Sequence, residues 1–311
     1  MSVPKMTRRK VLLVSTEATP GTAEAAPSTA LHVENLEAPD QTQWLERAGT
    51  SGGGTIGGTG GASVSQVTFT VRATHTGSAT APAWAALLAA CAVPASAGVY
   101  SPSSVPPGGS GRPATTLTLR YYEDGRLRTL AGCAGTFVAT MTAGGHVEVA
   151  FTFTGKLQSH ANAALPTPTW TTGEQLTRVA SGAFTVAGNA YTFAEARLDA
   201  GNRVELLQDA TDATGYLHAV VADRRPVLEV AILAPAISGT YAPVDWRKDG
   251  TTKALALQTS AGSGAMQLAA AAASVAGLST ADRNGSMFDT LRWALNRSGS
   301  DGDDFTLTWG A

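Results

Sequence analysis

Apolar and polar residues alternate along several segments of this chain. Val67, Phe69 and Val71 are separated by Thr68 and Thr70. The same period of two recurs in segments 117–121, 147–154, 228–232 and 305–309. Strict alternation is typical of a β-strand with one buried and one wetted face, and β-branched Thr suits the wetted face. The pattern therefore predicts a mainly β fold whose sheets have one dry face.

The order of these segments predicts that one domain occurs twice. Leu36 and Trp84 are 48 positions apart, and so are Leu198 and Trp246. An alternating stretch precedes each Leu, and each Trp follows shortly after an Ala-Pro pair. A chance recurrence in a chain of low compositional variety is the alternative. A repeat of this kind, if real, sets the fold and assembly of the whole chain.

Helical spacing is confined to short segments. Pro82 precedes one of them, Trp84–Cys91, whose apolar residues form one stripe. Met287–Arg297 has similar spacing and predicts an additional helix in the second copy. The Ala-rich run Leu268–Ala276 favours a helix by propensity, but its place in the repeat favours a strand. We expect one short helix per copy to cover the dry face of a sheet.

The boundary between the copies is expected near residue 165, in the Pro-containing linker 158–175. The first domain then spans 1–165, with an N-terminal arm, and the second spans 166–311. The Gly-rich loop 50–63 has only a polar counterpart in the second domain. We expect a neighbouring subunit to order this loop.

Composition indicates a subunit of an assembly. Hydrophobic residues make up 43% of the chain and charged residues only 15%, below the usual quarter or so. Such a surface is sparsely charged, so we expect neighbours to cover much of it. The net charge is −2, although four of the first ten residues are basic. The apolar run after them is too short for a signal-peptide core, and no stretch reaches membrane-spanning length, so we expect a soluble, non-secreted protein.

No segment has the pattern of an active site. The sequence G-T-S-G-G at Gly49–Gly53 lacks the helix that a nucleophile elbow requires after its Ser. The five His residues are scattered, and the Asp301–Asp304 cluster lacks the alternating ligands of a calcium loop. Cys91 and Cys133 have no metal-ligand spacing and are expected to be buried thiols. We predict no catalysis, no cofactor and no metal.

Three blocks of the chain resemble the tail tube proteins (major tail proteins) of long-tailed bacteriophages. They are TRRKVLLVSTEATPGT (Thr7–Thr22), ALHVENLEAP (Ala30–Pro39) and ASGAFTVAGNAYTFAEARLDAGNRVE (Ala180–Glu205). The most specific part is an apolar strand followed by a Glu, a Thr and a Gly-Thr turn. The resemblance implies two tandem β-sandwich or half-barrel tube domains, each with a short helix covering one sheet face.

The resemblance also implies assembly. Six tube domains form each ring of that family, and their sheets join into one inner barrel, so three chains of two domains would close a homotrimeric ring. A homohexameric ring suffices if only one copy lines the lumen. Roughly 24 strands spaced ~4.8 Å and tilted about 40° give a barrel about 48 Å across, wide enough for a DNA duplex. The implied partners are further copies, other tail proteins at the tube ends and passing double-stranded DNA, in a virion tail assembled in the bacterial cytoplasm.

A conduit wall should avoid clustered Lys and Arg, which hold phosphate by releasing counterions. The polar strand faces meet this requirement and supply our lumen-facing candidates, although an ordinary solvated sandwich exterior is the alternative. The candidates are Gln66, Thr68, Thr70, Glu148, Thr152, Thr154, Glu229, Thr306 and Thr308.

Stacking requires contacts along the tube axis. We expect the basic arm, the loop 40–61 and the acidic cluster near the C-terminus to supply them. The ring-stacking candidates are Lys5, Arg8, Arg9, Lys10, Asp40, Gly53, Ile56, Asp301, Asp303 and Asp304.

Two rival functions stay open. A tail terminator or a tube-like baseplate ring protein would share the fold but form a single ring. A carbohydrate-binding β module is more distant, because it should expose an aromatic platform, whereas the Trp residues here lie mainly in apolar stripes.

Overall fold

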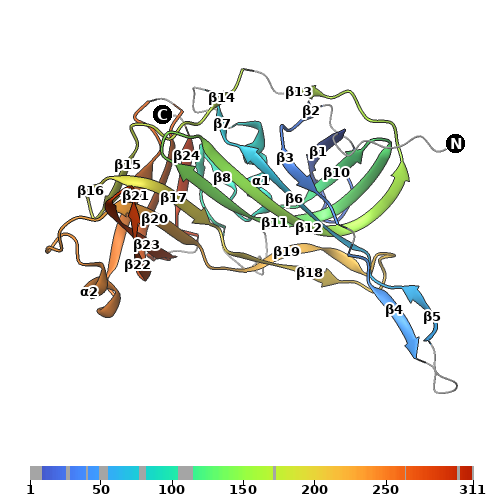
Figure 1. Ribbon diagram of the computed structural model, residues 1–311. Coiled ribbons are helices and arrows are strands. Elements are labelled where there is room, and N and C mark those ends of the chain that lie inside the picture. Colours follow the sequence, from blue (N-terminus) through green and yellow to red (C-terminus); the bar gives the residue numbers. More distant parts are fainter. Residues whose placement is uncertain are drawn as a thin grey trace.

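The computed structural model describes residues 9–25, 29–39, 41–48, 55–76, 82–103, 115–170, 173–262, 264–299 and 302–309. Strands make up 61% of the structure and helices 5%, which confirms the prediction of a mainly β fold. One large sheet of 16 strands forms most of the molecule, and the short helices lie beside it (Figure 1).

Twelve strands of this sheet form two sets of six. The first set is β1 (Lys10–Thr16), β3 (Glu34–Glu37), β6 (Val64–Arg72), β10 (Leu117–Glu123), β11 (Arg126–Thr142) and β12 (Val147–Asn162). The second set is β15 (Ala183–Val186), β17 (Phe193–Asp199), β20 (Val227–Leu233), β21 (Thr252–Gln258), β22 (Met266–Arg283) and β23 (Ser286–Asn296). The antiparallel pairing runs β1-β10-β11-β12-β6-β3 in one set and β15-β21-β22-β23-β20-β17 in the other. The two halves of the chain therefore have the same strand topology.

The same two additional elements follow equivalent strands in each half. A hairpin follows β3, formed by β4 (Trp44–Ala48) and β5 (Thr55–Gly60), and another follows β17, formed by β18 (Asn202–Gln208) and β19 (Tyr216–Arg224). A helix follows β6, formed by η1 (Ala83–Ala85) and α1 (Ala86–Ala90), and α2 (Pro243–Lys248) follows β20. The two Leu–Trp pairs with equal spacing thus lie in equivalent elements.

Short strands complete the structure. They are β2 (Thr29–Ala30), β7 (Thr74–His75), β8 (Ala95–Ser96), β9 (Val99–Tyr100), β13 (Thr169–Trp170), β14 (Gln175–Leu176), β16 (Asn189–Tyr191) and β24 (Thr306–Trp309). β24 pairs with the first residues of β22 and with β9, so the end of the described chain returns to the first half.

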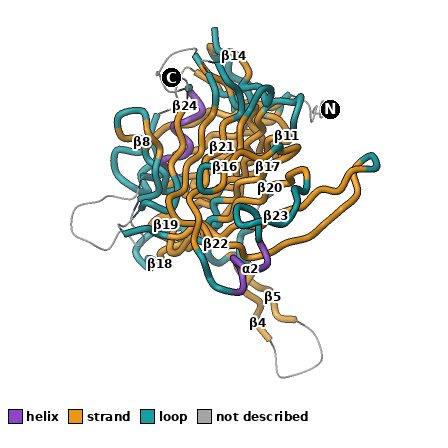
Figure 2. The backbone as a smooth tube through the Cα atoms, turned by 90° about the vertical axis from the view of Figure 1, so that its left-hand side faces the viewer, coloured by secondary structure: helices purple, strands orange, loops and turns teal. Residues whose placement is uncertain are grey.

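The two sets of strands join edge to edge through β11 and β17. Val138 lies opposite Asp199, and Thr142 lies opposite Glu195. The resulting path through the sheet is β16-β15-β21-β22-β23-β20-β17-β11-β12-β6-β3. In Figure 2, β17 and β20 lie next to β11, in the order that the pairing gives. The halves are therefore parts of one sheet.

One hydrophobic core follows the dry face of this sheet through both halves. In the first half Trp84 of η1 meets Trp309 edge-on, with 5.1 Å between ring centroids. In the second half Trp246 of α2 packs on Trp293 at 6.1 Å. Each short helix therefore places a buried Trp against the sheet, which fits the expectation of one covering helix per copy.

The helix predicted over Met287–Arg297 is wrong, because this segment is strand β23. Asn284 and Gly285 have φ values of 55° and 78° and close a two-residue turn between β22 and β23. An Asn-Gly pair favours this turn because both central residues need positive φ. Pairing with β20 and β22 on either side then places Trp293 in the core. The Ala-rich run Leu268–Ala276 lies in β22, which confirms the expected strand.

The hairpin β18–β19 lies across β11 and β12, and Ala219 packs on Ala134 there. Lys156 of β12 has a side chain only 4% exposed, and its Nζ lies 2.6 Å from Asp212, in the loop of this hairpin. Hydrogen bonds from Lys156 and Thr214 lower the pKa of Asp212 to about 2. The carboxylate therefore stays charged at neutral pH and ties the hairpin of the second half to the sheet of the first.

Candidate functional site

A row of polar residues crosses the face of the sheet opposite the hydrophobic core. Directly opposed residues in neighbouring strands share a face, so the row follows from the register. Its members, in spatial order, are Arg72, Glu148, Thr140, Arg197, Glu229 and Arg292. The row runs through β6, β12, β11, β17, β20 and β23, and it passes the junction between the two halves without interruption.

Uncharged polar residues lie beside this row on the first half. Thr68 of β6 is opposite Thr152 of β12, and Gln66 is opposite Thr154. Thr136 of β11 is in turn opposite Thr152. These side chains are half-buried. We refer to this surface, from β6 to β23, as the polar face.

The arginines of the polar face are all paired with carboxylates. Arg72 lies 2.9 Å from Glu34. Arg197 lies 3.5 Å from Asp199 and 3.9 Å from Glu229, and Arg292 lies 3.4 Å from the same Glu229. Arg283, at the end of β22, lies 3.1 Å from Glu195. These four arginines and the five carboxylates Glu34, Glu148, Glu195, Asp199 and Glu229 leave a formal charge of −1. A polyanion therefore meets no unpaired cluster of positive charge among them.

Most of the lumen-facing candidates share this face. Gln66, Thr68 and Thr70 lie on β6, Glu148, Thr152 and Thr154 on β12, and Glu229 on β20. The structure does not bring the other two into the row. Thr306 and Thr308 lie on β24, opposite Ala269 and Gln267 at the far end of β22.

The described part of the basic arm binds its own chain. Arg9 Nη1 lies 3.2 Å from Asp124, and Lys10 donates a 2.9 Å hydrogen bond to the carbonyl of Leu36. Ile56 lies in β5 of the projecting hairpin. Five further ring-stacking candidates lie outside the described residues, namely Lys5, Arg8, Asp40, Gly53 and Asp301.

The described acidic candidates near the C-terminus are also engaged within the chain. Asp303 accepts hydrogen bonds from the hydroxyl of Ser298 and the backbone of Gly299. Asp304 is buried and lies 2.6 Å from the guanidinium of Arg224, with side-chain exposures of 7% and 8%. A buried, paired carboxylate is not free for a contact between rings, so Asp304 has a structural role instead.

Sequence reasoning missed the contribution of β17 to the polar face. Glu195, Arg197 and Asp199 lie on that face, while Ala196 and Leu198 are buried in the core. This alternation has the same period of two as the strands that were identified, so the signal was present in the sequence. The sequence contains no comparable signal for the pairing of β17 with β11, because the packing of the whole fold determines which strands pair.

The described residues offer little other chemistry. Among them, no group of three or more His, Cys, Asp or Glu side chains is arranged to hold a metal ion. Burial raises the pKa of the Cys91 and Cys133 thiols, so the nucleophilic thiolate is disfavoured. No helix in the described part of the chain has the length and apolar character needed to cross a membrane.

No family model matches the chain, and no curated protein sequence matches it. The function is therefore inferred from the fold and from the chemistry of the polar face.

Proposed function

We propose that this protein is a structural subunit of a bacteriophage tail tube. Three chains close a ring, and rings stack into a hollow conduit for viral DNA in the virion tail, with other tail proteins at the ends of the tube. One observation carries the proposal. Two halves of equal topology join edge to edge into a single sheet, which is dry on one face and polar on the other.

The number of strands supports a ring of three chains. Eight strands of each chain, from β22 to β3 along the sheet, form the continuous wall. Three chains would supply 24 strands, and a closed barrel of that size is about 48 Å across at the backbone. Closure also removes exposed sheet edges, which otherwise promote aggregation.

The polar face supports passage of DNA without retention. Its arginines are paired and its other residues are mainly hydroxyls and carboxylates, so few counterions would be released on contact with phosphate. A duplex can then slide along such a wall. The wall requires no cofactor and no catalytic residue for this task.

Electron microscopy of the purified protein tests the proposal. We expect long hollow tubes, and a dissociated ring of about 95 kDa by native mass spectrometry, three times the chain mass of 31.7 kDa. Rings of six chains would show that the ring is a homohexamer and not a homotrimer. Single rings that never polymerise would favour a terminator or baseplate ring, and a monomer that binds glycans would contradict the proposal altogether.

Removing one carboxylate from the polar face should make the wall retain DNA. Glu229 lies between Arg197 and Arg292, so Glu229→Gln frees part of their charge. Opened or fragmented tubes of this variant should bind duplex DNA about five- to tenfold more tightly at low salt, with a salt slope steeper by about one unit. Fluorescence anisotropy across a salt series measures both quantities.

The matched control is Asp245→Asn. Asp245 is exposed on α2, which packs on the core side of the sheet, opposite the polar face. The control changes the net charge by the same amount without altering the polar face. Equal DNA binding by the two variants would show that the polar face does not meet DNA.

A further inference from the structure

The junction between the two halves of the chain has three parts. First, β17 pairs with residues 138–142 of β11. Second, the hairpin that follows β17 lies across β11 and β12. Third, the turn after β11 reaches the segment before β17, where the backbone N–H of Ala143 donates a 2.9 Å hydrogen bond to the carbonyl of Ala194.

Each part has a counterpart that lacks a partner within the described chain. β3 is equivalent to β17, and β6 is the only described strand that pairs with it. β22 is equivalent to β11, and beyond Gly277 its described pairing is with β23 alone. The hairpin β4–β5 is equivalent to β18–β19, yet it projects away from the body of the molecule (Figures 1 and 2).

The projecting hairpin exposes the large apolar side chain of Trp44, whose equivalent in the second half is packed against the sheet. Trp44 follows Leu36 by eight residues, and Leu206 follows Leu198 by eight residues. Leu206 packs against the cluster of Ala134, Ala219 and Val221, whereas Trp44 is 62% exposed. An exposed Trp on a projecting element is typical of an interface anchor.

A surface that fits Trp44 is present on the second half. Ala134 lies on β11 opposite Thr154 of β12. The equivalent pair on β22 and β23 is Ser274 opposite Ala294. Both of these side chains are small and partly exposed, so they leave room for an indole ring lying across the two strands.

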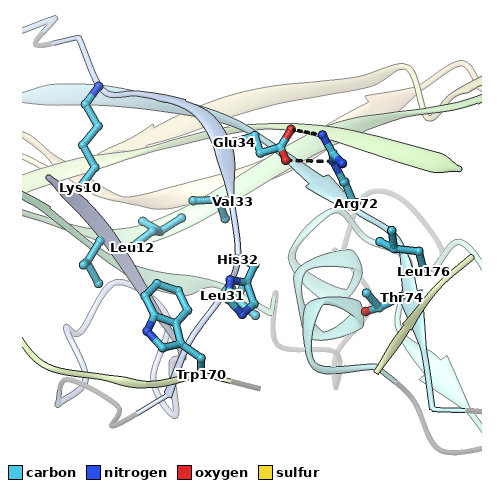
Figure 3. A pocket seen from close by; sticks show the side chains of 11 residues that line it. Lys10, Leu12, Leu31, His32, Val33, Glu34, Arg72, Thr74, Trp170 and Leu176 are labelled. Atoms are coloured by element: carbon cyan, nitrogen blue, oxygen red, sulfur yellow. Dashed lines mark hydrogen bonds and ion pairs between the residues drawn. The ribbon is translucent and has the colours of Figure 1, made fainter. Parts of the chain in front are cut away.

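A pocket beside β3 in the first half is equivalent to a pocket in the second half that the turn after β11 lines. In the second half, Ala143 and Gly144 line a pocket of about 480 Å³ together with residues before β17. In the first half, the equivalent pocket of about 320 Å³ is lined by β1, by Leu31–Glu34 and by Trp170 (Figure 3). The turn at Asn284–Gly285, next to Met287 with 59% exposure, is the equivalent element to line this pocket from a second copy.

We propose that two copies of this chain join by repeating the internal junction. The free edge of β3 pairs with Ser279–Arg283 of β22 in a second copy, and the hairpin β4–β5 lies across β22 and β23 of that same copy. This contact is heterologous, so successive copies add in one direction, and they form a ring when the rotation from copy to copy closes. The number of three chains in a closed ring rests on the proposed function, whereas the junction between two copies does not.

The internal register fixes the expected pairs. Val138 lies four residues before the end of β11, faces the polar side and is opposite Asp199. Ser279 lies four residues before the end of β22 and faces the same side. Glu37 follows Leu36 as Asp199 follows Leu198. Glu37 of one copy should therefore lie opposite Ser279 of the next.

A disulfide between these positions tests the junction. The variant Glu37→Cys/Ser279→Cys, oxidised with diamide during assembly, should give covalent multimers that end at a closed trimer on non-reducing gels. The native Cys91 and Cys133 are fully buried and do not compete. The control Glu37→Cys/Arg283→Cys places the second thiol ~13 Å farther along the strand and should stay monomeric. No cross-link in the first variant, or equal cross-linking in both, overturns the proposed register.

Trp44→Asp tests the hairpin contact. Since Trp44 is exposed in the single chain, we expect unchanged circular dichroism but a fall in cross-link yield of about tenfold or more. The control Leu45→Asp lies next to it, and its equivalent Leu207 stays 41% exposed at the internal junction, so the yield should stay within about twofold. An unchanged yield with Trp44→Asp, or an equal loss with both, overturns the hairpin contact.

These results separate the junction from the proposed function. Covalent rings from a protein that forms no tubes would support the junction and contradict the tail tube. Tubes assembled from chains that never form this disulfide would support the tail tube and contradict the junction.

Discussion

Replacing Glu17 by Ala should lower the free energy of unfolding by about 4 kcal/mol, a large part of the 5–15 kcal/mol typical of a domain. Glu17 is 7% exposed and immediately follows β1. Its carboxylate accepts four hydrogen bonds, from the hydroxyls of Thr116 and Thr118 and from the backbone of Gly21 and Gly132. Removing the acceptor leaves these buried donors without a partner, which costs more than the bonds contribute.

The same carboxylate shapes the turn that follows it. Gly21 has φ +82°, and a Cβ there would lie 2.3 Å from the carbonyl oxygen of Leu217 in β19. Glu17 thus holds a glycine turn of the first half against the hairpin of the second. Loss of Glu17 should therefore loosen the end of β1 and weaken the packing of the hairpin β18–β19 against the first half.

Urea unfolding at fixed protein concentration measures the effect of Glu17→Ala. Glu17→Gln keeps one acceptor oxygen and should lose about half as much stability. The control is Glu24→Ala in the same loop, whose carboxylate accepts an exposed hydrogen bond from the backbone of Ala18; we expect a loss below about 1 kcal/mol. Equal midpoints for Glu17→Ala and Glu24→Ala would contradict the structural role of the buried carboxylate.

Replacing Asp304 by Asn should cost about 3–5 kcal/mol, because it leaves the buried Arg224 guanidinium without its counter-charge. Arg224 contacts Asp304 through Nε at 2.7 Å and through Nη2 at 2.6 Å. A third donor, Nη1, binds the carbonyl of Ser103. The pair therefore joins the end of β19, the approach to β24 and a segment of the first half.

The double variant Arg224→Met/Asp304→Leu should recover much of that loss, because it removes both charges from the core. Asp223→Asn is the matched control. It breaks the neighbouring pair with Arg225, which spans 3.6 Å between side chains that are 52% and 89% exposed, so it should change stability by less than about 0.5 kcal/mol. Thermal unfolding of the four proteins distinguishes these cases, and a double variant as unstable as Asp304→Asn would contradict the ion-pair account.

The amino-acid sequence by itself determined the local features. Alternation of apolar and polar residues identified most strands and their dry faces, because side chains of a strand point to opposite sides in turn. The spacing of Leu36, Trp84, Leu198 and Trp246 marked equivalent elements in the two halves. Even the error at Met287–Arg297 has a local remedy, since Asn284-Gly285 is a hairpin signal that outweighs an approximate helical spacing.

Only the tertiary structure decided which strands meet and which charges are buried. The pairing of β11 with β17 joins the halves into one sheet, and the burial of Asp304 removes it from the surface on which the sequence had placed it. Glu17 meets Gly132, 115 positions away. Such contacts depend on the summed packing of distant segments, whereas alternation and turn geometry are fixed by neighbours in the chain.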